Sequence, residues 1–375
     1  MIKAIVELSP EQAHERQRSG ALMVDVREDG ERAAGMAEGA MGVSKGRLEA
    51  EPGAWLPELD GEILLICGVG ARSLQCARLL QSRGYTHVAS VSGGTTRWKA
   101  AGLPMSAATA DADFLERYSR HLRLAEVGLD GQRKLAAARV ALISAGGLGS
   151  PAALYLAAAG IGHITLIDDD LVDRSNLQRQ VLHRDVDIGT PKVESGCRTL
   201  AALNPHVVIE PQRTRLLASN VEALIRGHDV VIDGSDNFST RYLANDACVR
   251  LGLPMVYGAV QGFEGQVSVF WPAREGGSCY RCLFPEPPPA AFAPNCAEAG
   301  VLGVLPGVIG LLQATEAIKL ILGIGESLSG TLLQFDALGM RFNRLRLLRD
   351  PACPRCGNGV TAGDYVDVPT ACGVG

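Results

Sequence analysis

The stretch that decides the fold reads Arg139-Val140-Ala141-Leu142-Ile143, followed by Ser144-Ala145-Gly146-Gly147-Leu148-Gly149-Ser150. The first five residues are a short, mostly apolar run that predicts a β-strand, and a glycine-rich turn follows directly. Residues 151–159 are rich in alanine and leucine and begin with proline, which predicts a helix. Strand, turn and helix together form a unit that binds phosphate, because backbone N–H groups at the turn face the anion.

Two further strands are predicted downstream, and each ends in polar residues. Residues 163–167 end at Asp168, nineteen positions beyond Gly149, where an acid can accept hydrogen bonds from a ribose. Residues 230–233 end at Gly234-Ser235-Asp236. Ligands of open α/β sheets bind at this carboxyl-terminal edge of the strands. The sequence therefore predicts a Rossmann-like, nucleotide-binding α/β domain.

Charged residues narrow the type of nucleotide chemistry. An NAD site explains the glycines and Asp168, but it does not explain the cations Arg179 and Lys192. Transfer of a nucleotidyl group builds negative charge on the phosphates, which Arg and Lys stabilise. Asp170 and Asp236 offer hard oxygen ligands for Mg²⁺, with a solvated acidic loop as the alternative reading.

Residues from about 118 to 357 resemble the ATP-dependent adenylating enzymes MoeB and ThiF, relatives of the ubiquitin-activating enzymes. The resemblance is carried by ordered motifs, which are Arg117–Leu122, the glycine turn, Asn176-Leu177-Gln178-Arg179-Gln180, Gly189–Lys192, Asp236-Asn237 and two Cys-x-x-Cys pairs. It implies an enzyme that uses ATP and Mg²⁺.

The resemblance also assigns roles by position. It implies that Asp168 holds the ribose, that Asn176, Arg179 and Lys192 hold the phosphates, and that Asp236 holds the magnesium ion. Arg120 matches an arginine that reaches the partner subunit's ATP site, which implies a homodimer. The full predicted nucleotide site comprises Gly146, Gly147, Gly149, Asp168, Asp170, Asn176, Arg179, Lys192, Asp236 and Asn237.

One position departs from the family pattern. Ser144 stands where the family's glycine motif begins with glycine. Because serine restricts φ, an altered turn or a weaker ATP affinity is one consequence. The three other glycines are intact, and the site is predicted to be active.

Four cysteines predict a structural zinc site. Cys279 and Cys282 form one Cys-x-x-Cys pair, and Cys353 and Cys356 form the other. Four thiolates from two such pairs suit tetrahedral Zn²⁺, and in a cytosolic chain they favour a metal over a disulfide. A redox-active pair is the alternative.

Cys296 stands apart after a proline-rich loop. A cysteine at a helix start has its thiolate favoured by the helix dipole, although loop cysteines are more often incidental. Sulfur-handling enzymes that resemble ThiF carry, at the matching position, a cysteine that links to the C-terminus of the carrier protein.

The first hundred residues predict a second site. The predicted strand Glu62–Ile66 ends at Cys67-Gly68-Val69-Gly70-Ala71-Arg72, and an amphipathic helix follows. Such a loop surrounds the sulfur of Cys67 with N–H groups that stabilise an anionic persulfide. The segment resembles the active loop of rhodaneses, and its six residues favour sulfur transfer over phosphate-ester hydrolysis. A buried structural cysteine is the alternative reading.

Global properties are consistent with two soluble domains. The 375 residues carry a net charge of −5 with no basic cluster for nucleic acid, and the apolar stretch 301–325 is interrupted by Pro306, Glu316 and Lys319. We expect a cytoplasmic protein with a rhodanese-like domain (residues 1–106), a linker (107–113), an adenylylating domain (114–360) and a flexible tail (361–375).

Together these features predict that the chain adenylylates the C-terminal glycine of a ubiquitin-like sulfur carrier. A MoaD-like carrier of molybdenum cofactor biosynthesis is favoured, and a ThiS-like carrier is the alternative. A persulfide on Cys67, charged by a cysteine desulfurase or by thiosulfate, would then give a thiocarboxylate, with Arg72 completing the loop. Relatives in eukaryotes carry the rhodanese domain last, whereas here it comes first. A regulatory nucleotide-binding module and a nicotinamide oxidoreductase are competing hypotheses.

Overall fold

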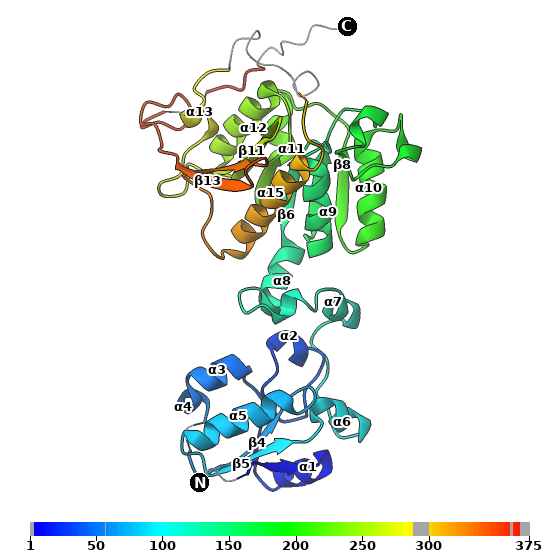
Figure 1. Cartoon of the computed structure of the whole chain (residues 1–375), viewed down its shortest axis with the longest axis vertical. Coiled ribbons are helices and arrows are strands. Elements are labelled where there is room, and N and C mark those ends of the chain that lie inside the picture. The colour runs from blue at the N-terminus through cyan, green and yellow to red at the C-terminus, as the bar shows by residue number, and fades with distance from the viewer. Residues whose placement is uncertain (1–3, 57, 288–299, 361–362, 368–375) are drawn as a thin grey trace. The chain divides into compact units, whose positions relative to one another are not determined.

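The computed structural model describes residues 4–56, 58–287, 300–360 and 363–367. The chain forms two compact units, residues 1–132 and 133–375 (Figure 1). Cys296 lies outside the described residues, as does most of the predicted tail. The two units are described separately.

The first unit is built on a five-stranded, all-parallel sheet in the order β1-β5-β4-β2-β3. Its strands are β1 (Val6–Leu8), β2 (Leu22–Asp25), β3 (Met41–Gly42), β4 (Glu62–Ile66) and β5 (His87–Val91). Strand β4 is central, and its last four residues are buried, as expected of a parallel strand covered on both faces. The residue after β4 is Cys67, so the fold places this cysteine at the middle of the sheet's carboxyl-terminal edge.

Helices connect these strands. They are α1 (Pro10–Arg18), α2 (Asp29–Arg32), α3 (Lys45–Ala50), α4 (Pro52–Trp55), α5 (Ala71–Ser82) and α6 (Gly94–Ala100). Helix α3 packs on α5, and α1 packs on α6. Helix α5 begins directly after the Cys67 loop, so its N-terminus faces the sulfur site.

The residues after the rhodanese-like segment pack onto α2 within the same unit. They include α7 (Ala112–Arg117) and the 3₁₀ helix η1 (His121–Arg123). Leu122 covers Gly30 so closely that a Cβ added at Gly30 would lie 2.6 Å from the Leu122 Cβ. Helix α8 (Gly128–Ala137) crosses from the first unit into the second. The predicted linker, residues 107–113, stays a prediction. The division between the two compact units lies further along the chain, between residues 132 and 133.

The second unit contains an eight-stranded sheet in the order β13-β12-β11-β10-β9-β6-β7-β8. Strands β6 to β10 run parallel and β11 to β13 are antiparallel. The strands are β6 (Arg139–Ile143), β7 (His163–Ile167), β8 (Val208–Gln212), β9 (Val230–Asp233), β10 (Met255–Gln261), β11 (Glu264–Phe270), β12 (Thr331–Asp336) and β13 (Arg341–Arg346). The predicted strands 139–143, 163–167 and 230–233 are confirmed.

The strand order reverses between β6 and β9, and this reversal locates the ligand site. The chain moves outward from β6 through β7 to β8, then returns to β9 on the other side of β6. Parallel strands are joined by right-handed crossovers, so the helices before and after the reversal cover opposite faces. The helices are α9 (Gly149–Ala159), η2 (Arg174–Asn176), η3 (Asp185–Asp187), α10 (Lys192–Leu203), α11 (Val221–Ile225), α12 (Phe238–Leu251), α13 (Tyr280–Leu283) and α15 (Leu305–Leu322). Ligands of open α/β sheets bind at such a switch point.

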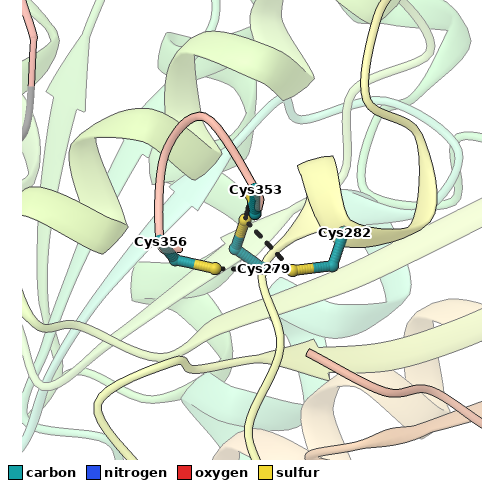
Figure 2. Close-up of side chains that lie close together, drawn as sticks. All are labelled: Cys279, Cys282, Cys353 and Cys356. Carbon is teal, nitrogen blue, oxygen red and sulfur yellow. Dashed lines mark hydrogen bonds between the residues drawn. The ribbon is translucent and has the colours of Figure 1, made fainter. Parts of the chain in front are cut away.

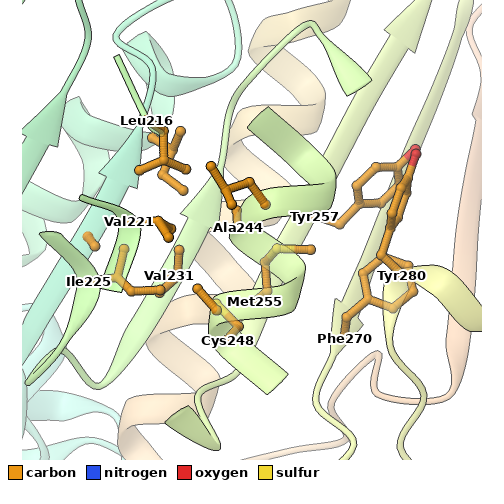
Figure 3. Close-up of a cluster of buried hydrophobic side chains, with 14 of the residues drawn as sticks. Leu216, Val221, Ile225, Val231, Ala244, Cys248, Met255, Tyr257, Phe270 and Tyr280 are labelled. Carbon is orange, nitrogen blue, oxygen red and sulfur yellow. The ribbon is translucent and has the colours of Figure 1, made fainter. Parts of the chain in front are cut away.

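A cluster of buried hydrophobic residues anchors α11 and α12 to the sheet (Figure 3). Val221 and Ile225 of α11 face Val231 of β9, and Met255 of β10 lies beside them. Aromatic rings close the cluster at its other end, where Tyr280 contacts its neighbours edge-on or tilted. The packing fixes the start of α12, which follows Asp236 and Asn237.

Helix α15 is long and apolar enough to cross a membrane, and half of its most apolar window is buried. It packs against α9, β10 and β11. Glu316 on this helix is buried, forms an ion pair with Lys319 and accepts a hydrogen bond from Leu328 N at 2.9 Å. These contacts are those of a core helix in an α/β domain.

Candidate active sites

A cavity of about 340 Å³ lies at the switch point of the second unit. Seven of the ten residues of the predicted nucleotide site line it, together with Ser144, and they come from the turn after β6, the segments after β7 and around η2, the start of α10 and the turn after β9. They are Ser144, Gly146, Gly147, Asp170, Asn176, Arg179, Lys192 and Asp236. Residues as far apart as 144 and 236 therefore meet as the strand order predicts.

A neighbouring cavity of about 180 Å³ continues from the first. Asp168, Asn237, Thr214 and Arg215 line this smaller cavity, and Ser144, Asp170, Ser235 and Asp236 line both cavities. The two cavities offer adjacent spaces for the two halves of a nucleotide.

The glycine turn is as tight as the motif predicts. A Cβ at Gly149 would lie 1.9 Å from the carbonyl oxygen of Ser144, and a Cβ at Gly147 would lie 3.2 Å from Pro306. Ser144 itself adopts φ 75°, the left-handed conformation that glycine favours. Serine therefore keeps the turn that glycine would form.

Asp168 is held rigidly after β7. Its Oδ2 accepts a hydrogen bond from Ala145 N and its Oδ1 accepts one from Asp170 N, each at 2.8 Å. Burial raises the pKa of Asp168 above its usual value, against the opposing charge of Lys192 and these two N–H groups. The carboxylate is thus a fixed acceptor at the edge of the smaller cavity.

Lys192 and Asp170, which both line the larger cavity, form an ion pair. Lys192 Nζ lies 2.7 Å from Asp170 Oδ2, and Lys192 is buried while Asp170 is exposed. From the sequence, Lys192 was predicted to bind phosphate and Asp170 to bind Mg²⁺. Because a buried cation needs a partner, the pair holds Lys192 in place until an anion competes for it.

Asn176, Arg179 and Gln180 also line the larger cavity. Asn176 Oδ1 accepts a hydrogen bond from Gln180 Nε2 at 2.7 Å, and Arg179 Nη1 donates to Ser175 O at 3.2 Å. Gln180 is buried, and its Oε1 has no hydrogen-bond partner among the described residues. A bound group with a donor would satisfy it.

Asn237 has a structural role that differs from the role of its neighbour Asp236. Its Oδ1 accepts a hydrogen bond from Thr240 N at 2.9 Å and caps α12. Asp236 lines both cavities and offers its carboxylate to them. Carboxylate oxygens of Asp168, Asp169 and Asp170 lie within 4.8 Å of one another, and Asp236 lines the same two cavities as Asp170 without belonging to that group. Carboxylates are ligands that suit Mg²⁺.

The structure adds Arg241 to this site. Arg241 is buried on α12, lines the larger cavity, and pairs with Asp233 through Nε–Oδ2 at 3.0 Å. Its guanidinium stacks 4.9 Å from the Tyr257 ring centre. Arg241 lies five residues after Asp236 in α12, a helix that the sequence analysis did not predict.

Arg120 lies in the first unit, exposed at the start of η1. The homodimer that its predicted role requires stays a prediction.

The four cysteines meet as predicted (Figure 2). Their sulfur atoms lie within 4.8 Å of one another, with Cys279–Cys353 at 3.6 Å and Cys282–Cys356 at 3.4 Å. Bonds of about 2.3 Å from tetrahedral Zn²⁺ to sulfur place the sulfur atoms about 3.8 Å apart, so the residues fit this metal. All four are free thiols rather than disulfides.

One buried carboxylate ties the two cysteine pairs together. Arg281 occupies the third position of the first pair and Arg355 the third position of the second. Asp246 of α12 forms an ion pair with each of them at 2.8 Å. Asp246 therefore holds the two cysteine motifs together through their arginines, and these ion pairs do not require a bound metal.

Cys67 forms the sulfur site of the first unit. The residue is buried, and its Sγ accepts hydrogen bonds from Gly70 N at 3.2 Å and Ser73 Oγ at 3.5 Å. Ser90 Oγ donates to Ser73 Oγ at 2.9 Å. Burial alone would raise the pKa of Cys67, but the Ser73 hydroxyl and the N–H groups of Ser73, Val69 and Gly70 bring it below the usual value.

Arg72 is held by an acid that the sequence analysis did not identify. Its two terminal nitrogens each lie 2.6 Å from an oxygen of Glu31 on α2. The hydrogen bond to Glu31 raises the pKa of Arg72, so the guanidinium stays charged. Glu31 lies 41 residues before Arg72, and neither periodicity nor motif spacing links them.

Residues of β2, the segment that follows it and α6 support the frame of the sulfur site. Arg27 and Asp25 form a buried ion pair at 2.7 Å, and Arg27 also donates to Gly35 O. Gly94 packs so closely that a Cβ there would lie 2.1 Å from the Cys67 carbonyl oxygen. These residues hold the loop rather than contact sulfur.

Comparisons with known proteins agree with both halves of the chain. Residues 118–355 match the ThiF family, and residues 9–101 match the rhodanese-like domain. The SAMP-activating enzyme E1 of Haloferax volcanii is 51% identical over 265 residues, covering 70% of this chain and 97% of that protein. The sulfur carrier protein adenylyltransferase of Thermus thermophilus is 49% identical over 263 residues, covering 69% and 97%.

A relative with two named activities and a solved structure complete the comparison. The adenylyltransferase and sulfurtransferase MOCS3 of Sus scrofa is 48% identical over 272 residues, covering 72% of this chain and 59% of that protein. The crystal structure of E. coli MccB with AMPCPP and selenomethionine MccA has a TM-score of 0.55 at 25% identity, covering 66% of this chain and 76% of that one. The chain belongs to the ThiF family and carries a rhodanese-like domain ahead of its ThiF domain.

Proposed function

We propose that this protein activates a ubiquitin-like sulfur carrier with ATP and then transfers sulfur to it. The observation that carries the proposal is the presence in one chain of a cavity lined by Arg179, Lys192 and Asp236 and of a loop that surrounds Cys67 with hydrogen-bond donors. The relatives named for adenylyl transfer and sulfur transfer support it.

In the first step, the carboxylate of the carrier's C-terminal glycine attacks the α-phosphorus of ATP, and pyrophosphate leaves. Arg179 and Lys192 stabilise the charge that develops on the phosphates, and Asp168 orients the ribose. Lys192 is released from Asp170 when phosphate binds. Asp236 and Asp170 would hold Mg²⁺, which neutralises phosphate charge when bound.

In the second step, the terminal sulfur of a Cys67 persulfide attacks the acyl carbon, and AMP leaves. The product is an acyl disulfide between the carrier and Cys67. Attack by the Cys296 thiolate on the Cys67 sulfur would release the thiocarboxylate and leave a Cys67–Cys296 disulfide, which a cellular dithiol then reduces. Cys296 is not among the residues that the structure describes.

The finer assignments belong to the same proposal. We favour a MoaD-like carrier over a ThiS-like one, a homodimer in which Arg120 serves the partner's ATP site, and the cytoplasm as the location. The sulfur source is a cysteine desulfurase or thiosulfate. The four cysteines hold structural Zn²⁺.

Carrier-dependent exchange between ATP and pyrophosphate tests the first step. Purified MoaD-like and ThiS-like proteins are compared with wild type and Asp236→Ala. We expect exchange with one carrier and none with the variant. ATP binding without exchange on either carrier would contradict the proposal and favour a regulatory nucleotide-binding module.

A second measurement isolates sulfur transfer. Cys67→Ala should abolish thiosulfate consumption while carrier-dependent exchange continues at the wild-type rate. Thiosulfate consumption that survives in this variant would contradict the role of Cys67.

A further inference from the structure

Ser144 occupies a strained position in the glycine turn. Its φ of 75° lies in the left-handed region, and among the described residues other than glycine only Met340 shares a positive φ. A non-glycine residue in this conformation is destabilising relative to glycine. A strained residue at a binding site points to a contribution from its side chain.

The Ser144 hydroxyl bridges two parts of the nucleotide site. It accepts a hydrogen bond from Gly146 N at 3.2 Å and donates one to Asp168 Oδ2 at 3.3 Å. Glycine at this position could make neither contact. The hydroxyl therefore joins the glycine turn to the acid after β7.

The place of Ser144 between the cavities gives this bridge a consequence. Ser144 lines both cavities, whereas Asp168 lines the smaller one. Ala145 N and the Ser144 hydroxyl both donate to Oδ2 of Asp168, while Asp170 N donates to Oδ1. The rotation of the carboxylate is thus fixed at both oxygens, and the backbone N–H of Ala145 alone would hold Oδ2 without the hydroxyl.

We propose that Ser144 is a positioning residue, whose hydroxyl holds the Asp168 carboxylate in the orientation that accepts a ribose hydroxyl. The inference rests on the proposed function, which makes Asp168 the ribose acceptor. It predicts that Ser144 sets the preference of the protein for ATP over deoxy-ATP. On this proposal, the preference for ATP over deoxy-ATP is the functional reason for a serine at a backbone conformation that favours glycine.

The test is calorimetric binding of ATP, 2′-deoxy-ATP and 3′-deoxy-ATP to the full chain with Mg²⁺. We expect wild type to bind ATP more tightly than at least one analogue. Ser144→Ala and Ser144→Gly should both reduce that ratio of dissociation constants by about tenfold, the effect of losing a hydrogen bond to a charged acceptor. Ser144→Gly removes both the hydroxyl and the backbone strain. This variant therefore shows the effect of losing the hydroxyl in a chain whose turn is not strained.

Two further variants separate the causes. Ser268→Ala removes a buried hydroxyl of β11 that lines neither cavity and donates to Thr331 O at 2.8 Å, and this variant should keep the wild-type ratio. Asp168→Asn should bind ATP and the deoxy analogues with similar dissociation constants. An unchanged ratio in Ser144→Ala, or one lost in Ser144→Ala but kept in Ser144→Gly, would overturn the role of the hydroxyl.

The outcome for Asp168 keeps this inference distinct from the proposed function. If Asp168→Asn loses the preference while both Ser144 variants keep it, Ser144 fails as a positioning residue and Asp168 stands. If Asp168→Asn keeps the preference, the inference fails at its premise. The pyrophosphate exchange assay then decides independently on adenylylation.

Discussion

Single side chains set the reactivity of the sulfur site. Cys67 and Cys76 are both buried cysteines in the same core cluster, yet their environments differ in hydrogen-bond donors. Donors around Cys67 lower its pKa, whereas burial raises the pKa of Cys76 to about 12. Of the two thiols, Cys67 therefore ionises at the lower pH.

We expect Ser73→Ala to raise the pKa of Cys67. The Ser73 hydroxyl stabilises the thiolate, so its removal shifts the ionisation of Cys67 to higher pH. The pH dependence of Cys67 alkylation by iodoacetamide, followed by peptide mass spectrometry, measures the shift. Cys76 provides the internal control and should stay unmodified across the neutral range. An identical profile in wild type and variant would rule out this contribution of Ser73.

At the scale of elements, tight packing of short segments positions each site. The start of α6 presses on the Cys67 loop, where Thr95 N donates to Cys67 O at 2.7 Å and Thr96 Oγ1 donates to Gly68 O at 2.9 Å. Gly94 at this contact has a φ of +56° and no room for a side chain. The conformation of the loop therefore depends on α6 as well as on its own residues.

Gly94→Ala should abolish persulfide formation on Cys67 and leave ATP–pyrophosphate exchange unchanged. The added Cβ would lie 2.1 Å from the Cys67 carbonyl oxygen and displace the loop. Gly102→Ala is the matched control, because Gly102 also has a positive φ of +66° but has open space around its Cβ position. Mass spectrometry after incubation with thiosulfate detects the persulfide. Equal loss in both variants would assign the effect to backbone strain instead.

Helix α12 connects the nucleotide site to the cysteine cluster. Its cap, Asn237, follows Asp236, and its Asp246 pairs with arginines of both cysteine motifs. We expect Asp246→Asn to release the proposed zinc ion to a chromogenic chelator at least several times faster than wild type, because two partly buried guanidinium groups lose the charge of their shared partner. Glu210→Gln, which removes an acid paired with His163, should release zinc at the wild-type rate. Equal rates in the two variants would show that the ion pairs do not hold the cluster.

At the scale of the whole molecule, the order of the two domains raises the question of how sulfur reaches the acyl-adenylate. Joining a donor and an acceptor in one chain raises their effective concentration. The gain in the rate of sulfur transfer can be measured by comparing joined domains with separate ones.

Mixing two defective variants tests transfer within one assembly. Cys67→Ala keeps the nucleotide site and Asp236→Ala keeps the sulfur site. We expect wild type to form carrier thiocarboxylate at a rate per molecule that does not change on dilution, whereas the mixture should slow in proportion to its concentration. Mass spectrometry of the carrier measures the product. A mixture as fast as wild type at every dilution would show that the fusion gives no advantage.

The sequence predicted what is local and what lies at strand ends. The strands 139–143, 163–167 and 230–233 and the meeting of the four cysteines follow from apolar runs and short motifs. The family and the rhodanese-like domain are confirmed on the same motifs. The pairing of Arg72 with Glu31 and of Lys192 with Asp170 depends on tertiary contacts that no local pattern encodes. Ser144 was identified as a departure, but its link to Asp168 required the fold.

The shared carboxylate of Asp246 has a consequence for how the protein matures. In a zinc finger the metal drives folding, because the ligands are scattered in the unfolded chain. Here two segments more than 70 residues apart are fastened by ion pairs to a helix of the core, independently of the metal. If the four cysteines hold zinc as we propose, folding can therefore precede metallation, and newly made protein can wait for the metal in a folded apo form.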